Sequence, residues 1–191
     1  MARPRRNIES GEIYHVTSRG NNGQRTFKER ADHLHFLALL ETVATRYGWT
    51  ILAYCLMSNH YHLVVRAGDL GISSGMRDLN GGFARWSNRR YGRTGHLWRN
   101  RFFATRLKDE AHALLTCRYV ALNAVRARMC RLPEEYVWSS YRASAGLTMP
   151  PRFLKVDELL SLFCNGRRFG QREYRMFVAE GVAQVAATTS G

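Results

Sequence analysis

The order of strand-like and helix-like patterns is the feature that most constrains the fold of this chain. Alternating apolar and polar residues predict a strand over 12–20, and apolar residues at helical spacing predict a helix over 28–47, ended by Gly48. The segments that follow read as strand, strand, helix, strand and helix, over residues 49–57, 60–67, 72–91, 101–108 and 109–126. This order predicts an α+β fold, a ferredoxin-like antiparallel sheet with helices on one face.

The second half of the chain predicts an appended unit. Asp109 is a suitable cap for the third helix, and residues 133–148 read as an ordered loop with short turns. Two consecutive prolines then indicate a boundary, with one domain over 1–149 and a C-terminal helical extension over 150–191. Short helices are expected over residues 156–163 and 171–182.

The charge of the chain indicates its class of partner. It has 29 Lys and Arg against 15 Asp and Glu, a net charge of +14, and only three of the basic residues are lysines. Before residue 150 there are 23 basic and 11 acidic residues, and after it 6 and 4. Because arginine forks match phosphate oxygens and stack on bases, nucleic acid is the expected partner, with an acidic membrane surface as the alternative.

The protein is expected to be cytoplasmic and associated with the nucleoid. No apolar run approaches the length of a membrane span or a secretion signal, so no membrane association is expected. Four cysteines, Cys55, Cys117, Cys130 and Cys164, form no Cys-x-x-Cys pair. They are expected to be reduced and mostly buried thiols rather than zinc ligands or a redox pair.

His60, Tyr61 and His62 form the sharpest motif. Side chains two apart on a strand project from the same face, so both imidazoles can reach one ion while Tyr61 points the other way. His33 and His35 have the same spacing, but they lie in a predicted helix, where such side chains diverge. The alternative for His60 and His62 is a pair of half-buried structural histidines.

The third predicted helix offers further reactive groups. Two imidazoles without thiolates suit Mn²⁺, or Mg²⁺ if phosphate oxygens and water complete the shell, and a carboxamide or carboxylate is the usual third protein ligand. Tyr119 and Asn123 are four residues apart and share one helix face. Alternatively, Tyr119 packs at a helix–sheet contact and Asn123 only precedes the helix end.

Residues 79–108 contain 8 Lys and Arg and no acidic residue, interleaved with aromatic side chains. Positive groups alternating with flat rings suit a channel for single-stranded nucleic acid, although a solvated basic face would have the same composition. Some of the rings must be core, so Trp98, Arg99 and Arg101 are expected to contact DNA rather than Phe102 and Phe103.

Taken together, five segments resemble the HUH single-tyrosine transposases, the IS200-like family, and more narrowly its REP-associated tyrosine transposases. The segments are YHVTSRGNNGQRTF at 14–27, AYCLMSNHYHLVV at 53–65, GHLWRNRFFA at 95–104, RYVALNAVRARM at 118–129 and PEEYVWSSYRA at 133–143. They span about two thirds of the chain.

The resemblance implies a function and a set of site residues. His60 and His62 would hold Mg²⁺ or Mn²⁺, with Asn123 as a third polar ligand, and Tyr119 would be the nucleophile. The family pattern continues Asn-Pro, whereas Ala124 follows here, which affects the bend of the helix but removes no reactive group. His96 is a candidate general base, since no obvious one is encoded near Tyr119.

The implied substrate is single-stranded DNA beside a hairpin of the repetitive extragenic palindrome (REP) type, cut through a 5′-phosphotyrosine link by a monomer or homodimer. The expected DNA contacts combine the loop after the first strand with the basic segment: Arg19, Asn21, Asn22, Arg25, Arg85, Arg89, Arg90, Trp98, Arg99 and Arg101. The alternatives are a non-catalytic binder of single-stranded nucleic acid on the same fold and a replication or relaxase initiator nuclease.

Overall fold

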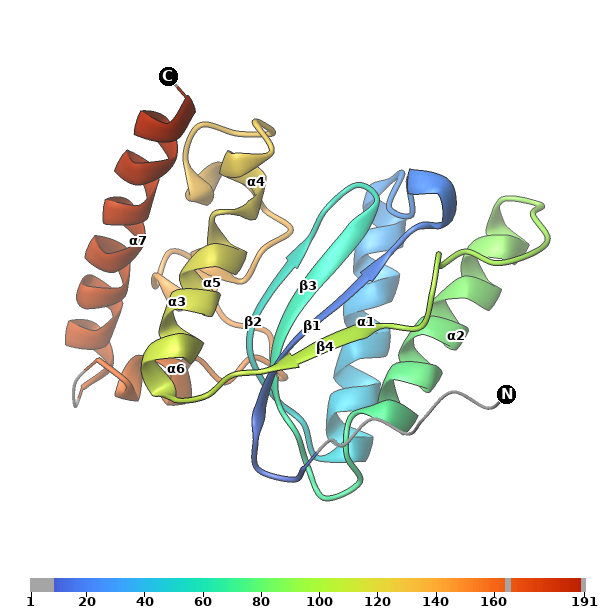
Figure 1. The fold of residues 1–191 in the computed structure, drawn as a ribbon, viewed down its shortest axis with the longest axis horizontal. Coiled ribbons are helices and arrows are strands. Elements are labelled where there is room, and N and C mark those ends of the chain that lie inside the picture. Colours follow the sequence, from blue (N-terminus) through green and yellow to red (C-terminus); the bar gives the residue numbers. More distant parts are fainter. Residues whose placement is uncertain (1–8, 164–165, 190–191) are drawn as a thin grey trace.

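The computed structural model of the chain describes residues 9–163 and 166–189. Within them one antiparallel sheet has the strand order β2-β3-β1-β4. Its strands are β1 (Ile13–Arg19), β2 (Thr50–Leu56), β3 (His60–Arg66) and β4 (Phe103–Arg106), and helices α1 (Arg30–Tyr47) and α2 (Ser73–Arg90) connect them (Figure 1). This β-α-β-β-α-β order confirms the ferredoxin-like α+β fold.

Helices α1 and α2 lie side by side on one face of the sheet, as predicted (Figure 1). Tyr61 of β3 points to this face, where its fully buried ring lies 4.7 Å from that of Phe36. Gly48 ends α1 in the left-handed conformation, with φ of 64°, which glycine adopts without strain. Gly75 allows α2 to approach Trp49, since a Cβ there would lie 2.3 Å from the indole ring.

The third helix lies on the opposite face of the sheet, so helices cover both faces, whereas the sequence predicts helices on one face only. Helix α3 (Glu110–Ala121) packs against β2 and β3 (Figure 1). Ile51 to Leu56 and Tyr61 to Val65 are consequently buried without interruption, because both sides of these two strands are covered. Such continuous burial indicates a two-sided sheet, which strand alternation alone did not predict.

The remaining elements follow α3 and close the β2 edge of the sheet. They are α4 (Asn123–Arg126), α5 (Tyr141–Ser144), α6 (Val156–Ser161), α7 (Arg167–Thr189) and the 3-10 turn η2 (Pro133–Glu135). A further 3-10 turn, η1 (Asn21–Gly23), lies between β1 and α1. Two later segments pair with β2: Leu56 N donates to Trp138 O and Lys155 N donates to Ile51 O, both at 2.9 Å. The two predicted C-terminal helices correspond to α6 and to α7, which is longer than predicted. The division of the chain into a domain and a C-terminal extension at residue 150 stays a prediction.

Two further expectations concern membranes and thiols. Of the helices described, none combines the length and apolar character needed to cross a bilayer. Cys55 and Cys117 are buried free thiols, and burial raises the pKa of both, that of Cys117 to about 12. Cys130 is a partly buried free thiol, and Cys164 lies outside the described residues.

Candidate active site

The two histidines of β3 project from the same face of the sheet, the face that α3 covers. Their ring centroids are 5.0 Å apart, and the ring planes meet at 78°. Tyr61 points to the opposite face, where its hydroxyl donates to Asn80 Oδ1 at 2.7 Å. The alternation predicted for this motif is therefore confirmed, and the imidazoles of His60 and His62 are close enough to bind the same ion.

Helix α3 brings Tyr119 to the same place. Asp109 caps the helix as predicted, since its Oδ1 accepts from His112 N at 2.7 Å. The ring of Tyr119 lies edge-on to His62, with centroids 5.7 Å apart, and its side chain is 39% exposed. The Arg126 guanidinium lies 5.2 Å from the centroid of the Tyr119 ring. A phosphodiester can reach a tyrosine that is exposed to solvent, and a neighbouring cation attracts its negative charge.

A third histidine, His15 of β1, belongs to this cluster and was not identified from the sequence. His15 Nε2 lies 2.9 Å from His62 Nδ1, and the two rings stack at 5.1 Å with an interplanar angle of 15°. Its ring is also 6.0 Å from that of Tyr119. Strand alternation places His15 and Thr17 on one face of β1, but only the β3–β1 pairing, which sets Thr17 opposite His62, shows which face.

The surroundings of these imidazoles favour their neutral form. Burial, with smaller contributions from His15 and His60, lowers the pKa of His62 to about 3. Burial and the charge of Arg19 lower the pKa of His60, and burial with His112 lowers that of His15. A neutral imidazole offers one nitrogen lone pair as a ligand.

Hydrogen bonding indicates which nitrogen atoms are available. His62 Nε2 is buried and has no hydrogen-bond partner within the described part of the chain, whereas its Nδ1 faces His15. His60 Nδ1 lies 2.7 Å from Asn59 Oδ1, an acceptor that fixes the proton on that nitrogen and leaves the lone pair on Nε2. An orphaned buried ring nitrogen is what a metal ligand presents before its ion binds.

The protein's own ligand set is small. Over residues 9–163 and 166–189, no group of three or more His, Cys, Asp or Glu side chains is arranged to hold an ion. Asn123 is buried beside the end of α3, where its Nδ2 donates to Tyr119 O at 3.0 Å, so its side-chain oxygen is the atom left for a ligand role. Two imidazoles and one amide oxygen leave positions for water and phosphate oxygens, as Mg²⁺ and Mn²⁺ prefer.

The other His-x-His pair has a packing role, as its helical placement predicts. His33 stacks on Trp138 and His35 on Trp86, each at a centroid distance of 4.2 Å. Their rings therefore lie against different partners and do not converge on one point.

The predicted DNA-contact residues fall into groups. Arg19, at the end of β1, is exposed and pairs across the ladder with His60. The loop that follows contains Asn21, which is partly buried, and Asn22 and Arg25, which are exposed. This end of β1 therefore borders the histidine site.

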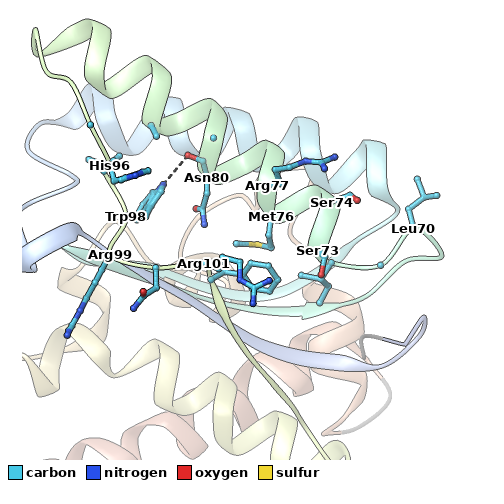
Figure 2. A pocket seen from close by; sticks show the side chains of 18 residues that line it. Leu70, Ser73, Ser74, Met76, Arg77, Asn80, His96, Trp98, Arg99 and Arg101 are labelled. Atoms are coloured by element: carbon cyan, nitrogen blue, oxygen red, sulfur yellow. Dashed lines mark hydrogen bonds between the residues drawn. The ribbon is translucent and has the colours of Figure 1, made fainter. Parts of the chain in front are cut away.

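A cleft of about 1130 Å³ lies between α2 and residues 95–102, on the α1–α2 side of the sheet. Figure 2 shows Arg101 directed into this cleft, whereas Arg99 points away from it. Trp98 lines the cleft but is half-buried, with its Nε1 donating to Asn80 O at 3.0 Å. His96 also lines the cleft, so it lies across the sheet from Tyr119 and is not placed as its general base.

The remaining basic and aromatic residues divide between surface and core. Arg85, Arg89 and Arg90 are all exposed on α2, and Arg90 also forms an ion pair with Glu29 at 2.6 Å, so their contacts with DNA stay predictions. Phe102 is 6% exposed, as expected of a core ring. Phe103 is 66% exposed, so it is not a core ring, and the ranking of these residues as DNA contacts stays a prediction.

The chain is similar to known proteins in sequence and in fold. A family model described as "Transposase IS200 like" matches residues 10–123. A solved REP-associated tyrosine transposase bound to a REP hairpin is 17% identical and superposes with a TM-score of 0.65, covering 79% of this chain and 89% of that one. A protein assigned as a transposase from Deinococcus radiodurans R1 is 19% identical, with a TM-score of 0.43 and coverage of 60% and 93%. No curated protein matches the chain.

Proposed function

The chain belongs to the IS200-like transposase family, and we propose that it cuts and rejoins single-stranded DNA through a covalent bond to Tyr119. The observation that carries this proposal is the placement of Tyr119 beside His62. Tyr119 on α3 and His62 on β3 come from segments more than 50 residues apart, yet the exposed phenol ring lies 5.7 Å from the neutral imidazole. Packing alone does not need a lone pair left without a partner in a buried site.

The proposed reaction is a transesterification. The Tyr119 oxygen attacks the scissile phosphorus, the bond from phosphorus to the 3′ oxygen breaks, and a 5′-phosphotyrosine link forms. The phenol gives up its proton and the departing 3′ oxygen gains one, so the number of phosphoester bonds is unchanged. Attack by another 3′ hydroxyl reverses the step and joins strands without nucleotide hydrolysis. Arg126, beside the Tyr119 ring, adds positive charge where the phosphate would bind.

His60, His62 and Asn123 are the residues that we propose hold Mg²⁺ or Mn²⁺. The fit is supported by the orphaned His62 Nε2 and by the Nε2 lone pair of His60. When bound, such an ion withdraws charge from phosphate oxygens. Asn123 would use its side-chain oxygen, because its nitrogen already donates to Tyr119 O. That hydrogen bond also ties the proposed ligand to the helical turn that carries the nucleophile.

His15 orients His62 in this proposal. If His62 Nδ1 donates its proton to His15 Nε2, then the lone pair of His62 resides on Nε2, the atom without a partner. The parallel stacking of the two rings further restricts rotation of His62. His15 is thus a positioning residue behind the proposed ligand.

A DNA hairpin with a single-stranded flank, of the REP type, is the substrate that we propose. The structural relative with a TM-score of 0.65 was solved with a REP hairpin, and the exposed Arg19, Asn22 and Arg25 border the histidine site. Arg99 projects away from the cleft and Arg101 into it, so we expect the two to contact different parts of the DNA. Arg85 and Arg89 of α2 add exposed charge for backbone contacts.

Removal of divalent ions tests the proposed activity. The purified protein is incubated with end-labelled hairpin DNA that carries a single-stranded flank. We expect no cleavage in EDTA and recovery when Mn²⁺ is added in excess, because His60 and His62, as neutral imidazoles, supply no positive charge of their own. Cleavage that proceeds equally in EDTA would contradict a metal-dependent reaction. Binding without cleavage in Mn²⁺ and in Mg²⁺ would support the non-catalytic binder instead.

Replacing His15 tests the orienting role. We expect His15→Ala to weaken Mn²⁺ binding by roughly 10- to 100-fold, because outer partners of metal ligands have effects of this size. His15→Gln keeps an acceptor for the His62 Nδ1 proton and is expected to recover most of the affinity. The measurement is titration with Mn²⁺ followed by electron paramagnetic resonance, without DNA. Equal affinity of His15→Ala and wild type would rule the role out.

A further inference from the structure

Phe103 begins β4, and its aromatic ring is largely exposed on the face that carries the histidines. Isolated exposed apolar side chains are common on protein surfaces, so exposure alone carries little weight. The register of the sheet adds the second observation. Phe103 pairs with Thr17 of β1, and Thr17 pairs with His62 of β3. We call these three cross-strand neighbours, Phe103, Thr17 and His62, the active-face row.

The active-face row runs from a covered end to an open one. Helix α3 packs against β2 and β3 and brings Tyr119 over His62, which is buried. At the other end, Phe103 and Thr105 of the edge strand β4 are exposed on the same face. Neighbouring strands are about 4.8 Å apart, so Phe103 begins about 10 Å from His62. The row therefore leads from solvent to the proposed nucleophile.

Two arginines lie along this open end. Arg19 is two residues beyond Thr17 on β1 and projects from the same face. The backbone of Arg99 is hydrogen-bonded to that of Arg19, since Arg99 N donates to Arg19 O at 2.9 Å. The cleft lies on the α1–α2 side of the sheet, and the Arg99 side chain points away from it (Figure 2). In the described part of the chain neither arginine is ion-paired to a carboxylate.

We propose that Phe103 is a stacking platform for an unpaired base in the DNA strand that leads to Tyr119. This inference rests on the proposed function and adds where the strand lies. A ring flanked by unpaired guanidinium groups suits single-stranded DNA, in which bases stack on the ring while arginines contact the phosphates. Because every base has a flat face, the platform fixes the position of the strand and not its sequence.

Binding measurements in a cleavage-deficient background test this platform. All proteins carry Tyr119→Phe, so that binding is read without chemistry, and the probes are a fluorescently labelled hairpin with a single-stranded flank and the same hairpin with a blunt end. Phe103→Ala removes the ring, Phe103→Leu keeps apolar bulk, and Phe103→Trp keeps an aromatic face. Phe169→Ala is the matched control, because Phe169 on α7 is also 66% exposed.

We expect Phe103→Ala to weaken binding of the flanked hairpin by roughly 5- to 150-fold and to leave the blunt hairpin unaffected. Phe103→Leu should lose most of the same affinity, whereas Phe103→Trp and Phe169→Ala should bind as the parent protein does. One abasic position in the flank should weaken binding to the parent protein but not to Phe103→Ala, which identifies the stacked base.

Other results would overturn the platform. Unchanged binding by Phe103→Ala, an equal loss on both hairpins, or full affinity of Phe103→Leu would each show that the ring does not stack on the flank. These outcomes are independent of the proposed chemistry, because binding is measured without cleavage. Conversely, a wild-type protein that binds but never cuts would refute the proposed activity and leave the stacking result intact.

Discussion

Tyr119→Phe is expected to reduce cleavage of the flanked hairpin by at least about 10³-fold, since it removes the attacking oxygen and leaves no substitute nucleophile. The ring and its contacts with His62 and Arg126 are retained, so folding and DNA affinity should not change. The measurement is the single-turnover rate with Mn²⁺, with binding determined in parallel by anisotropy.

Tyr91→Phe is the matched control for loss of a tyrosine hydroxyl. The Tyr91 hydroxyl donates to Asp32 at 2.8 Å, in a network that includes α1 and the end of α2 and lies apart from the histidines. We expect this variant to cut at the wild-type rate once folded. Normal cleavage by Tyr119→Phe would exclude this residue as the nucleophile.

His60→Ala and His62→Ala are expected to lower cleavage by at least about 10²-fold while most DNA affinity is kept. Each variant removes one of the two imidazoles that we propose hold the ion, whereas the arginines that we propose contact DNA are untouched. Titration with Mn²⁺ should show weakened binding in both variants. Loss of both rings should be little worse than loss of either, because the two act on a single ion.

His35→Ala provides the comparison within the same chain. His35 belongs to the other His-x-His pair, and its ring stacks on Trp86. Its loss should reduce stability without changing cleavage or Mn²⁺ affinity. If His62→Ala cuts DNA as fast as His35→Ala does, then the β3 histidines are structural and the proposed metal site is wrong.

Much of the fold could be predicted because local patterns follow backbone geometry. The period of two on β3 correctly separated His60 and His62 from Tyr61, and helical spacing correctly set His33 and His35 apart. Gly48 and Asp109 marked helix ends through conformational and capping preferences that act within a few residues. These features need no knowledge of distant segments.

The parts that were missed depend on how distant segments pair. His15 shows alternation like any strand residue, and only the strand order brings it 2.9 Å from His62. Charge and aromatic content described the basic segment but not the partner of each side chain, such as the ion pair of the exposed Arg90 with Glu29. Phe103 and Phe102 were ranked together because composition does not assign a face, whereas in the fold Phe102 is buried and Phe103 is exposed.

Mapping the covalent adduct is the most direct test of the central claim. Wild-type protein is mixed with hairpin DNA carrying a single-stranded flank in Mn²⁺, digested, and the peptide linked to nucleotide is sequenced by mass spectrometry. The account predicts one linkage, a 5′-phosphate ester on Tyr119, absent from Tyr119→Phe. Cleavage without any protein–DNA linkage, or a linkage to another residue, would contradict it.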